Sequence, residues 1–238
     1  MSDARSIELA DNLREVRARI DGACIDAGRN PGDVTLIVVT KTWPSDDVRR
    51  LAELGVRDVG ENRDQEAAPK AQATADCDLH WHFVGQLQTN KAASVARYAD
   101  VVHSVDRVPL VTALEKGASK AGRRIGCLIE VDLDEAATGR GGVAPQGVPA
   151  LADAIVAADH LDLLGVMGVA PLAPEGQKEA SAAAFARLGA ISASLRADHP
   201  GATVMSAGMS EDLEEAIAAG ATHLRVGSAV LGTRPPLG

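Results

Sequence analysis

The chain has 238 residues, of which 46% are hydrophobic and 2% aromatic, and it carries a formal net charge of −9. An acidic chain with few stacking side chains argues against a nucleic-acid partner, and no apolar run reaches the ~18 residues that a membrane helix needs. Three scattered cysteines without a CxxC motif, and first residues without a secretory signal, predict a protein of the reducing cytoplasm without disulfides or structural zinc.

The predicted elements begin with a helix over residues 6–27, where apolar residues from Leu9 to Ile20 recur at helical spacing before Gly28 ends it. Strand-like apolar runs and helix-like stretches then alternate. The predicted strands cover residues 34–40, 56–60, 80–85, 101–105, 125–133, 161–170, 203–206 and 223–226. The predicted helices cover residues 45–54, 61–75, 89–98, 108–121, 145–158, 175–197 and 211–219, and Pro69 is expected to break or restart the second of them.

Eight strands that alternate with helices favour a parallel sheet, and that number favours closure into a barrel. The sequence therefore predicts an α/β fold, a single (β/α)8 TIM barrel. Because no linker or change of composition is visible, residues 1–238 are expected to form one domain. Residues 1–28 would be a leading helix that packs on the barrel.

Lys41 follows the first predicted strand, at the end of a barrel where active sites lie. The loops 206–210 and 225–228 follow strands seven and eight, which often hold phosphate in such barrels, and closure brings both loops beside Lys41. An amine that forms a Schiff base needs a desolvated or cation-flanked setting, which the barrel rim would provide. An amine and a phosphate cradle are what pyridoxal 5'-phosphate (PLP) requires. Taken alone, however, Lys41 could be a solvated loop residue and Ser210 an ordinary helix cap.

Two further side chains fit a PLP site. Arg225 is a permanent donor, so a ring nitrogen that faces it stays unprotonated and the ring becomes a weaker electron sink. Asn62 could donate to the phenolic oxygen of the cofactor, although asparagine is also common where helices begin. Its neighbour Glu61 could instead cap the following helix.

A competing hypothesis comes from His80 and His82, which share one face of the third predicted strand, and from Glu130, Asp132 and Asp134 near the fifth. These residues could belong to a metal-dependent barrel hydrolase. The simpler interpretation is that one histidine lines the pocket and the other packs. The loop Gly139–Gly142 lacks the spacing of a dinucleotide site, and the roles of this loop and of the two histidines stay open.

Several motifs together resemble the pyridoxal phosphate homeostasis protein family (YggS, or proline synthase co-transcribed homologue), which is similar to the barrel domain of alanine racemase. The resemblance covers nearly the whole chain. It lies in the motifs at residues 39–42, 60–62, 82–91, 103–106, 165–167, 206–210 and 225–228.

The resemblance implies a PLP fold type III barrel in which Lys41 holds PLP as a Schiff base (the covalent aldimine). It also implies phosphate-holding positions at Ser206, Ser210, Gly227 and Ser228, with Arg225 at the pyridine nitrogen. Such a protein would buffer or deliver this vitamin B6 cofactor without established turnover and would meet apo PLP-dependent enzymes transiently. The single predicted domain and the polar surface favour a monomer. The alternative is a racemase or lyase. A racemase of this fold takes a second base, a tyrosine, from an added domain of a partner chain. Without that tyrosine, Lys41 would be the single acid/base.

Overall fold

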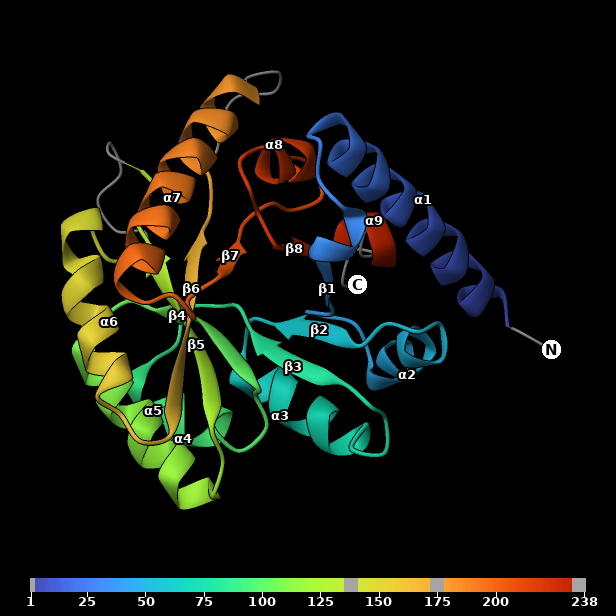
Figure 1. Cartoon of the computed structure of the whole chain (residues 1–238). Coiled ribbons are helices and arrows are strands. Elements are labelled where there is room, and N and C mark those ends of the chain that lie inside the picture. Colours follow the sequence, from blue (N-terminus) through green and yellow to red (C-terminus); the bar gives the residue numbers. More distant parts are fainter. Residues whose placement is uncertain (1–2, 135–140, 172–177, 233–238) are drawn as a thin grey trace.

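A computed structural model describes residues 3–134, 141–171 and 178–232, and its centre is a closed barrel of eight parallel strands in chain order (Figure 1). The strands are β1 (Thr35–Val39), β2 (Asp58–Glu61), β3 (His80–Phe83), β4 (Val101–Val105), β5 (Ile125–Val131), β6 (Leu161–Gly168), β7 (Val204–Ser206) and β8 (His223–Val226). The barrel closes where β1 pairs with β8, from Thr35 opposite His223 to Val38 opposite Val226. The predicted (β/α)8 fold and its eight strands are confirmed.

The strands form from runs rich in β-branched residues, which are favoured in strands and here are buried on both sides of the sheet. Ile37, Val38, Val59, Val102 and Ile129 are fully buried. Six of the eight strands are one or two residues shorter than predicted, and β4 and β8 have the predicted bounds.

The helices between the strands cover the outside of the barrel. They are α2 (Ser45–Glu53), α3 (Asp64–Ala73), α4 (Ala92–Val95), α5 (Val108–Ala121), α6 (Val148–Val156), α7 (Lys178–Asp198) and α8 (Leu213–Ala218). Short 3-10 turns precede β1, α4 and α6 at Pro31–Asp33, Thr89–Lys91 and Pro145–Gly147. Residues 175–177 of the predicted seventh helix lie outside the described residues.

Helix α3 corrects one prediction, because it runs through Pro69 instead of breaking there. Pro69 is exposed, so water can satisfy the carbonyl oxygen that the proline leaves without a donor. A short final helix, α9 (Ser228–Leu231), was not predicted and starts at the last residue of the final motif.

Helix α1 (Ala4–Asp26) lies beside α8 and α9 (Figure 1). Asp3 caps its first turn by accepting the Ser6 N–H at 2.7 Å, and Gly28, at φ +66°, follows its end. One face of α1, including Leu9, Leu13 and Ile20, joins the hydrophobic core of the barrel.

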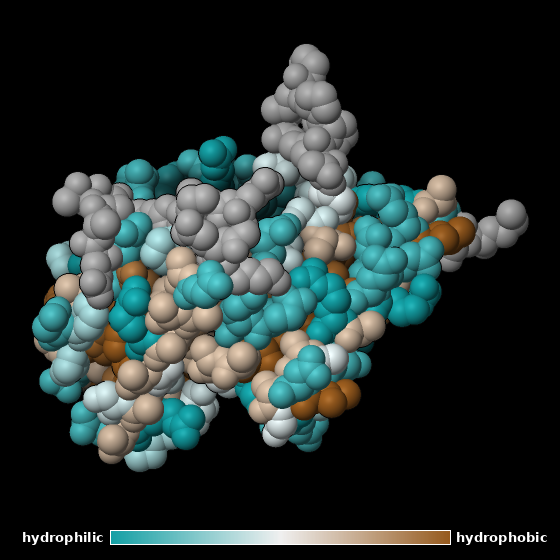
Figure 2. All heavy atoms as spheres, turned by 90° about the horizontal axis from the view of Figure 1, so that it is seen from above, coloured by the Kyte–Doolittle hydropathy of each residue, from teal (hydrophilic) through white to brown (hydrophobic). Residues whose placement is uncertain are grey.

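The outer surface seen in Figure 2 is largely hydrophilic, and the strongly hydrophobic residues form small separate groups. Among the described residues, no helix is both long enough and apolar enough to cross a membrane.

Candidate functional site

A cavity of about 410 Å³ opens at the carboxyl ends of the strands, where the sequence places the site. Six of the seven predicted site residues line it, although they come from both ends of the chain. Its lining residues are Val39, Lys41, Asn62, Val84, Val169, Met209, Ser210, Glu211, Arg225, Gly227 and Ser228. The seventh predicted residue, Ser206, is fully buried and is not part of this lining.

The residue before Lys41 is held from inside the protein. Lys70 of α3 donates from Nζ to the carbonyl oxygen of Thr40 at 2.8 Å and to Glu61 Oε1 at 2.5 Å. The Thr40 hydroxyl donates to the same Glu61 oxygen at 2.7 Å. Burial raises the pKa of Glu61 above its usual value, although Lys70 and Thr40 act in the opposite direction. Glu61 is therefore a buried brace, and the alternative that it caps α3 is wrong.

The residue after Lys41 is held from the same helix. Thr42 has φ +70°, a left-handed conformation that costs a threonine about 1–2 kcal/mol. The carboxylate of Glu66 accepts the Thr42 N–H at 2.9 Å and so helps to keep the turn. Both peptide units that flank Lys41 are thus fixed by α3. The Lys41 side chain itself is exposed at the cavity, which differs from the expected desolvated setting.

The loops after β7 and β8 meet through Ser210. Its Oγ lies 3.1 Å from Ser228 Oγ and accepts the Ala229 N–H at 3.3 Å. Gly227 brings its backbone close to β1, since a Cβ atom there would lie 3.3 Å from the carbonyl oxygen of Val39. Two hydroxyls and a closely approaching backbone therefore stand beside the lysine.

Ser210 is not the helix cap that its sequence position suggested. Helix α8 starts at Leu213, and its cap residue Asp212 turns back to accept the Met209 N–H at 2.7 Å. Glu211, by contrast, lines the cavity. An acidic residue thus lines the pocket in which the sequence predicted an anion site, and sequence reasoning did not count Glu211 among the site residues.

Arg225 lies at the back of the cavity with only 5% of its surface exposed. Its guanidinium donates to Ser206 Oγ at 2.6 Å and to the carbonyl oxygen of Gly168 at 3.0 Å. Burial lowers the pKa of Arg225 to about 10, which leaves it a cation at neutral pH. Ser206, expected at the phosphate, instead contacts Arg225 from beneath the pocket.

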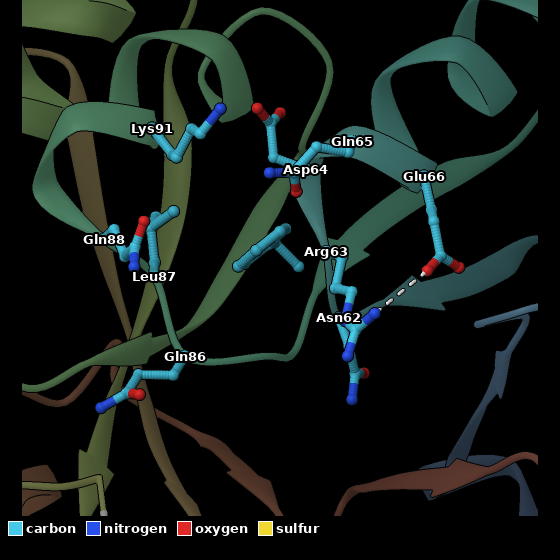
Figure 3. A pocket seen from close by; sticks show the side chains of 10 residues that line it. Asn62, Arg63, Asp64, Gln65, Glu66, Gln86, Leu87, Gln88 and Lys91 are labelled. Atoms are coloured by element: carbon cyan, nitrogen blue, oxygen red, sulfur yellow. Dashed lines mark ion pairs between the residues drawn. The ribbon is translucent and has the colours of Figure 1, made fainter.

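Asn62 forms part of the wall, and its Oδ1 is buried without a hydrogen-bond partner among the described residues. Gly85 fixes its backbone, because a Cβ atom at Gly85 would lie 2.2 Å from the Asn62 carbonyl oxygen. Asn62 also lines a second cavity of about 510 Å³ on the α3 side (Figure 3). Lys91 and Asp64 point toward one another there, and Arg63 approaches Glu66 at 4.0 Å.

The two histidines of β3 do not form a metal pair with the acidic residues of β5. His80 is exposed and His82 is buried, and both contact Asp58 Oδ1, at 3.3 and 3.0 Å. Strand β5 ends at Val131, so the three acidic residues do not share a strand face. Among the described residues, no group of three or more His, Cys, Asp or Glu side chains could hold a metal ion. Gly139 and Arg140 lie outside the described residues.

Comparisons with known proteins identify the family of the chain. The family model of the alanine racemase N-terminal domain matches residues 8–235. The pyridoxal phosphate homeostasis protein of Mycobacterium tuberculosis is 39% identical over 97% of this chain and 94% of its own length. The protein of that name from Escherichia coli is 33% identical over 95% of this chain and 97% of its own.

The chain belongs to the pyridoxal phosphate homeostasis protein family. A solved structure of PipY from Synechococcus elongatus, with PLP bound, shares 32% identity with this family member at a TM-score of 0.80, over 94% of this chain and all of PipY. Alanine racemase from Corynebacterium glutamicum shares the fold. It is 17% identical at a TM-score of 0.67, over 98% of this chain and 62% of the racemase chain.

Sequence reasoning missed the residues of this family member that brace Lys41. Lys70 and Glu66 lie on α3, far from the lysine in sequence, and only the packing of α3 brings them to it. One available signal was Lys70 itself, which shares the buried face of α3 with Ala67 and Ala71. A lysine on an apolar helix face needs a partner of opposite charge.

Proposed function

We propose that this chain binds PLP in the cavity at the carboxyl ends of its strands, linked covalently to Lys41, and buffers or delivers it in PLP homeostasis without catalytic turnover. The meeting of Lys41, Ser210 and Arg225 in one cavity of about 410 Å³ carries this proposal. A volume of that size is usual for a small-molecule site.

The cavity residues fit the cofactor by their chemistry. When bound, PLP supplies an aldehyde that accepts amines and a ring that withdraws electrons. Lys41 offers the amine, while Ser210, Ser228 and the backbone at Gly227 offer donors to the phosphate. Asn62, which lines the cavity, offers an amide N–H donor to the phenolic oxygen. Ser206 would act on the cofactor through Arg225.

Two features favour binding of PLP without catalytic turnover. Arg225 has donors only, so it would face a ring nitrogen in its unprotonated form, which disfavours carbanion chemistry. Tyr98, the only tyrosine of the sequence, packs edge-on against Trp81 with ring centroids 6.4 Å apart and is not among the residues that line the cavity. Burial raises the pKa of Tyr98, so its hydroxyl is a poor base.

Borohydride trapping tests the covalent link. The protein is mixed with PLP, reduced and digested, and the label is located by mass spectrometry. We expect one label, on Lys41, which is lost in Lys41→Arg and kept in Lys91→Arg, because Lys91 belongs to the neighbouring cavity that shares Asn62. A label on Lys91, or spread over surface lysines, would refute the proposal.

The second candidate is a racemase or lyase with Lys41 as single acid/base, and Glu211 at the cavity gives this candidate a further proton acceptor. Exchange of the α-hydrogen of amino acids with deuterated water separates the two. We expect no exchange above that of free PLP. Rapid exchange that disappears in Lys41→Ala would establish the enzyme instead.

We further propose that residues 1–238 act as one PLP-binding domain, with α1 as part of it, and that the protein is a cytoplasmic monomer that meets apo PLP-dependent enzymes transiently. The packing of α1 into the barrel core supports the single unit. Mixing the PLP-loaded protein with an apo enzyme tests delivery, and recovery of activity faster than with an equal concentration of free PLP is expected.

A further inference from the structure

A row of hydrogen-bonding side chains crosses the inside of the barrel. It begins at Asp58, the first residue of β2, which lies at the end of the barrel opposite the cavity. It passes through His82 and His103, both buried, and through the buried Ser206 to Arg225 at the cavity. The proposed function uses only the last of these five residues directly.

Each neighbouring pair in this row is within hydrogen-bonding distance. His82 Nε2 lies 3.0 Å from Asp58 Oδ1, and His82 Nδ1 lies 2.9 Å from His103 Nε2. His103 Nδ1 lies 3.0 Å from Ser206 Oγ, which accepts from the Arg225 guanidinium at 2.6 Å. The row is therefore continuous from one end of the barrel to the other.

The two ends of the row fix the direction of its protons. Arg225 can only donate, so Ser206 accepts from it and has its own proton left for His103 Nδ1. A neutral His103 then carries its proton on Nε2 and donates to His82 Nδ1. His82 in turn donates from Nε2 to the Asp58 carboxylate, which can only accept. Every donor in this arrangement meets an acceptor.

The opposite placement of the ring protons leaves donors and acceptors that do not pair. If His82 and His103 carried their protons on Nδ1, the bare His82 Nε2 would face the Asp58 carboxylate, and two acceptors would meet at 3.0 Å. A doubly protonated His82 would avoid that clash, but it would leave the Ser206 proton without an acceptor. Burial lowers the pKa of His103 well below its usual value and keeps it neutral.

We propose that Asp58, His82 and His103 are positioning residues that hold the Arg225 guanidinium in place through Ser206, so that a carboxylate at the far end of the barrel controls the donor at the cofactor ring. This role rests on the proposed function, because it is the ring nitrogen of PLP that Arg225 would meet. The row also gives His82 a role that the histidine pattern of β3 left open.

The ring tautomers of the cofactor-free protein test the direction. In protein labelled with ¹⁵N-histidine, long-range ¹H–¹⁵N spectra show which ring nitrogen carries the proton. We expect both His82 and His103 to be protonated on Nε2 alone. In Asp58→Asn we expect mixed tautomers, because an amide can donate as well as accept. Protonation of either ring on Nδ1, or unchanged ring signals in Asp58→Asn, would overturn the proposal.

The effect on the cofactor is tested with the same variants. We expect Asp58→Asn and Ser206→Ala each to weaken PLP binding about three- to tenfold and to shift the absorption band of bound PLP. Ser206→Ala cuts the row beside Arg225 and keeps His82 bonded to Asp58, so it serves if Asp58→Asn fails to fold. A PLP spectrum and affinity unchanged in Ser206→Ala would also overturn the proposal.

The control is Asp162→Asn. Asp162 lies near the amino end of β6 and pairs with Arg124, outside the row, so its variant should keep the spectrum and the affinity. A wild-type protein that fails to bind PLP would refute the proposed function and with it the role at the ring, whereas the ring tautomers would still report the direction of the row. The two failures are therefore distinguishable.

Discussion

Lys70 donates a hydrogen bond to the carbonyl oxygen of Thr40 at 2.8 Å, and Thr40 is the residue directly before Lys41. The same ammonium pairs with Glu61, whose carboxyl also binds the Thr40 hydroxyl. A buried ion pair between β2 and α3 thus holds the peptide that carries the proposed PLP lysine. Buried pairs contribute little net stability but are costly to break, so their substitution is informative.

Lys70→Met should destabilise the protein and weaken PLP binding. It leaves the Glu61 carboxyl buried without its cation, which typically costs about 3–5 kcal/mol. Urea unfolding measures the stability, and a PLP titration measures the affinity. Adding Glu61→Gln removes the buried charge, so the double variant should recover part of the stability but not the affinity. Unchanged stability in Lys70→Met would contradict the role of the Lys70–Glu61 pair in holding the Thr40 peptide.

Gly85→Ala should displace Asn62 and so reduce PLP binding. The added Cβ would meet the backbone of Asn62 at 2.2–2.8 Å, and a backbone yields less readily than a side-chain end. The matched control is Gly22→Ala on α1, where a Cβ has nothing within 4 Å. Because alanine is the better helix former, that control should gain up to about 1 kcal/mol. Equal PLP affinity in the two variants would show that Gly85 does not position Asn62.

Glu211→Gln should tighten PLP binding a few-fold. The Glu211 carboxylate lines the same cavity as the residues proposed to hold the phosphate, so like charges repel when PLP is bound. Because Glu211 is exposed, salt should screen the repulsion, and the gain should shrink at high ionic strength. Glu53→Gln on α2 makes the same charge change outside the cavity and should leave the affinity as it is. Weaker binding in Glu211→Gln would give this carboxylate a supporting role instead.

The stability of the protein should fall in mild acid because of His223. Burial lowers the pKa of His223 to about 4, whereas an imidazole in the unfolded chain titrates near ~6.5. Between these values the unfolded state binds the additional proton, so the free energy of unfolding decreases as the pH falls. The slope approaches about 1.4 kcal/mol per pH unit for one proton.

His223→Gln should make the free energy of unfolding less dependent on pH between pH 6.5 and pH 4. The reduction in slope should be at most that of one proton, about 1.4 kcal/mol per pH unit. The buried carboxyl of Glu130 acts with the opposite sign, because burial raises its pKa to about 7 and its protonation favours the folded state as the pH falls. Glu130 is present in both proteins, so its effect cancels in the difference between their unfolding curves. Parallel curves for the wild type and the variant would contradict the lowered pKa of His223.

The sequence by itself determined the barrel and most of the candidate site. The alternation of strands and helices is a local pattern, and eight strands left closure as the simplest arrangement. Closure then required Lys41, Ser210, Arg225 and Ser228 to face one cavity, because β1, β7 and β8 are neighbours around the barrel. Lys41, Ser210 and Ser228 follow strand ends and Arg225 lies near the end of β8, so their positions along the chain were sufficient to place them.

Only the tertiary structure decided what each side chain touches. Ser206 is the last residue of β7 and Ser210 lies four residues later, yet Ser206 lies beneath the cavity with Arg225 and Ser210 lines it. Lys70 reaches Thr40, and His82 reaches His103, across sequence separations that carry no periodic signal. The physical reason is that strand periodicity fixes which face a residue occupies, whereas the depth and tilt of neighbouring elements fix its partner.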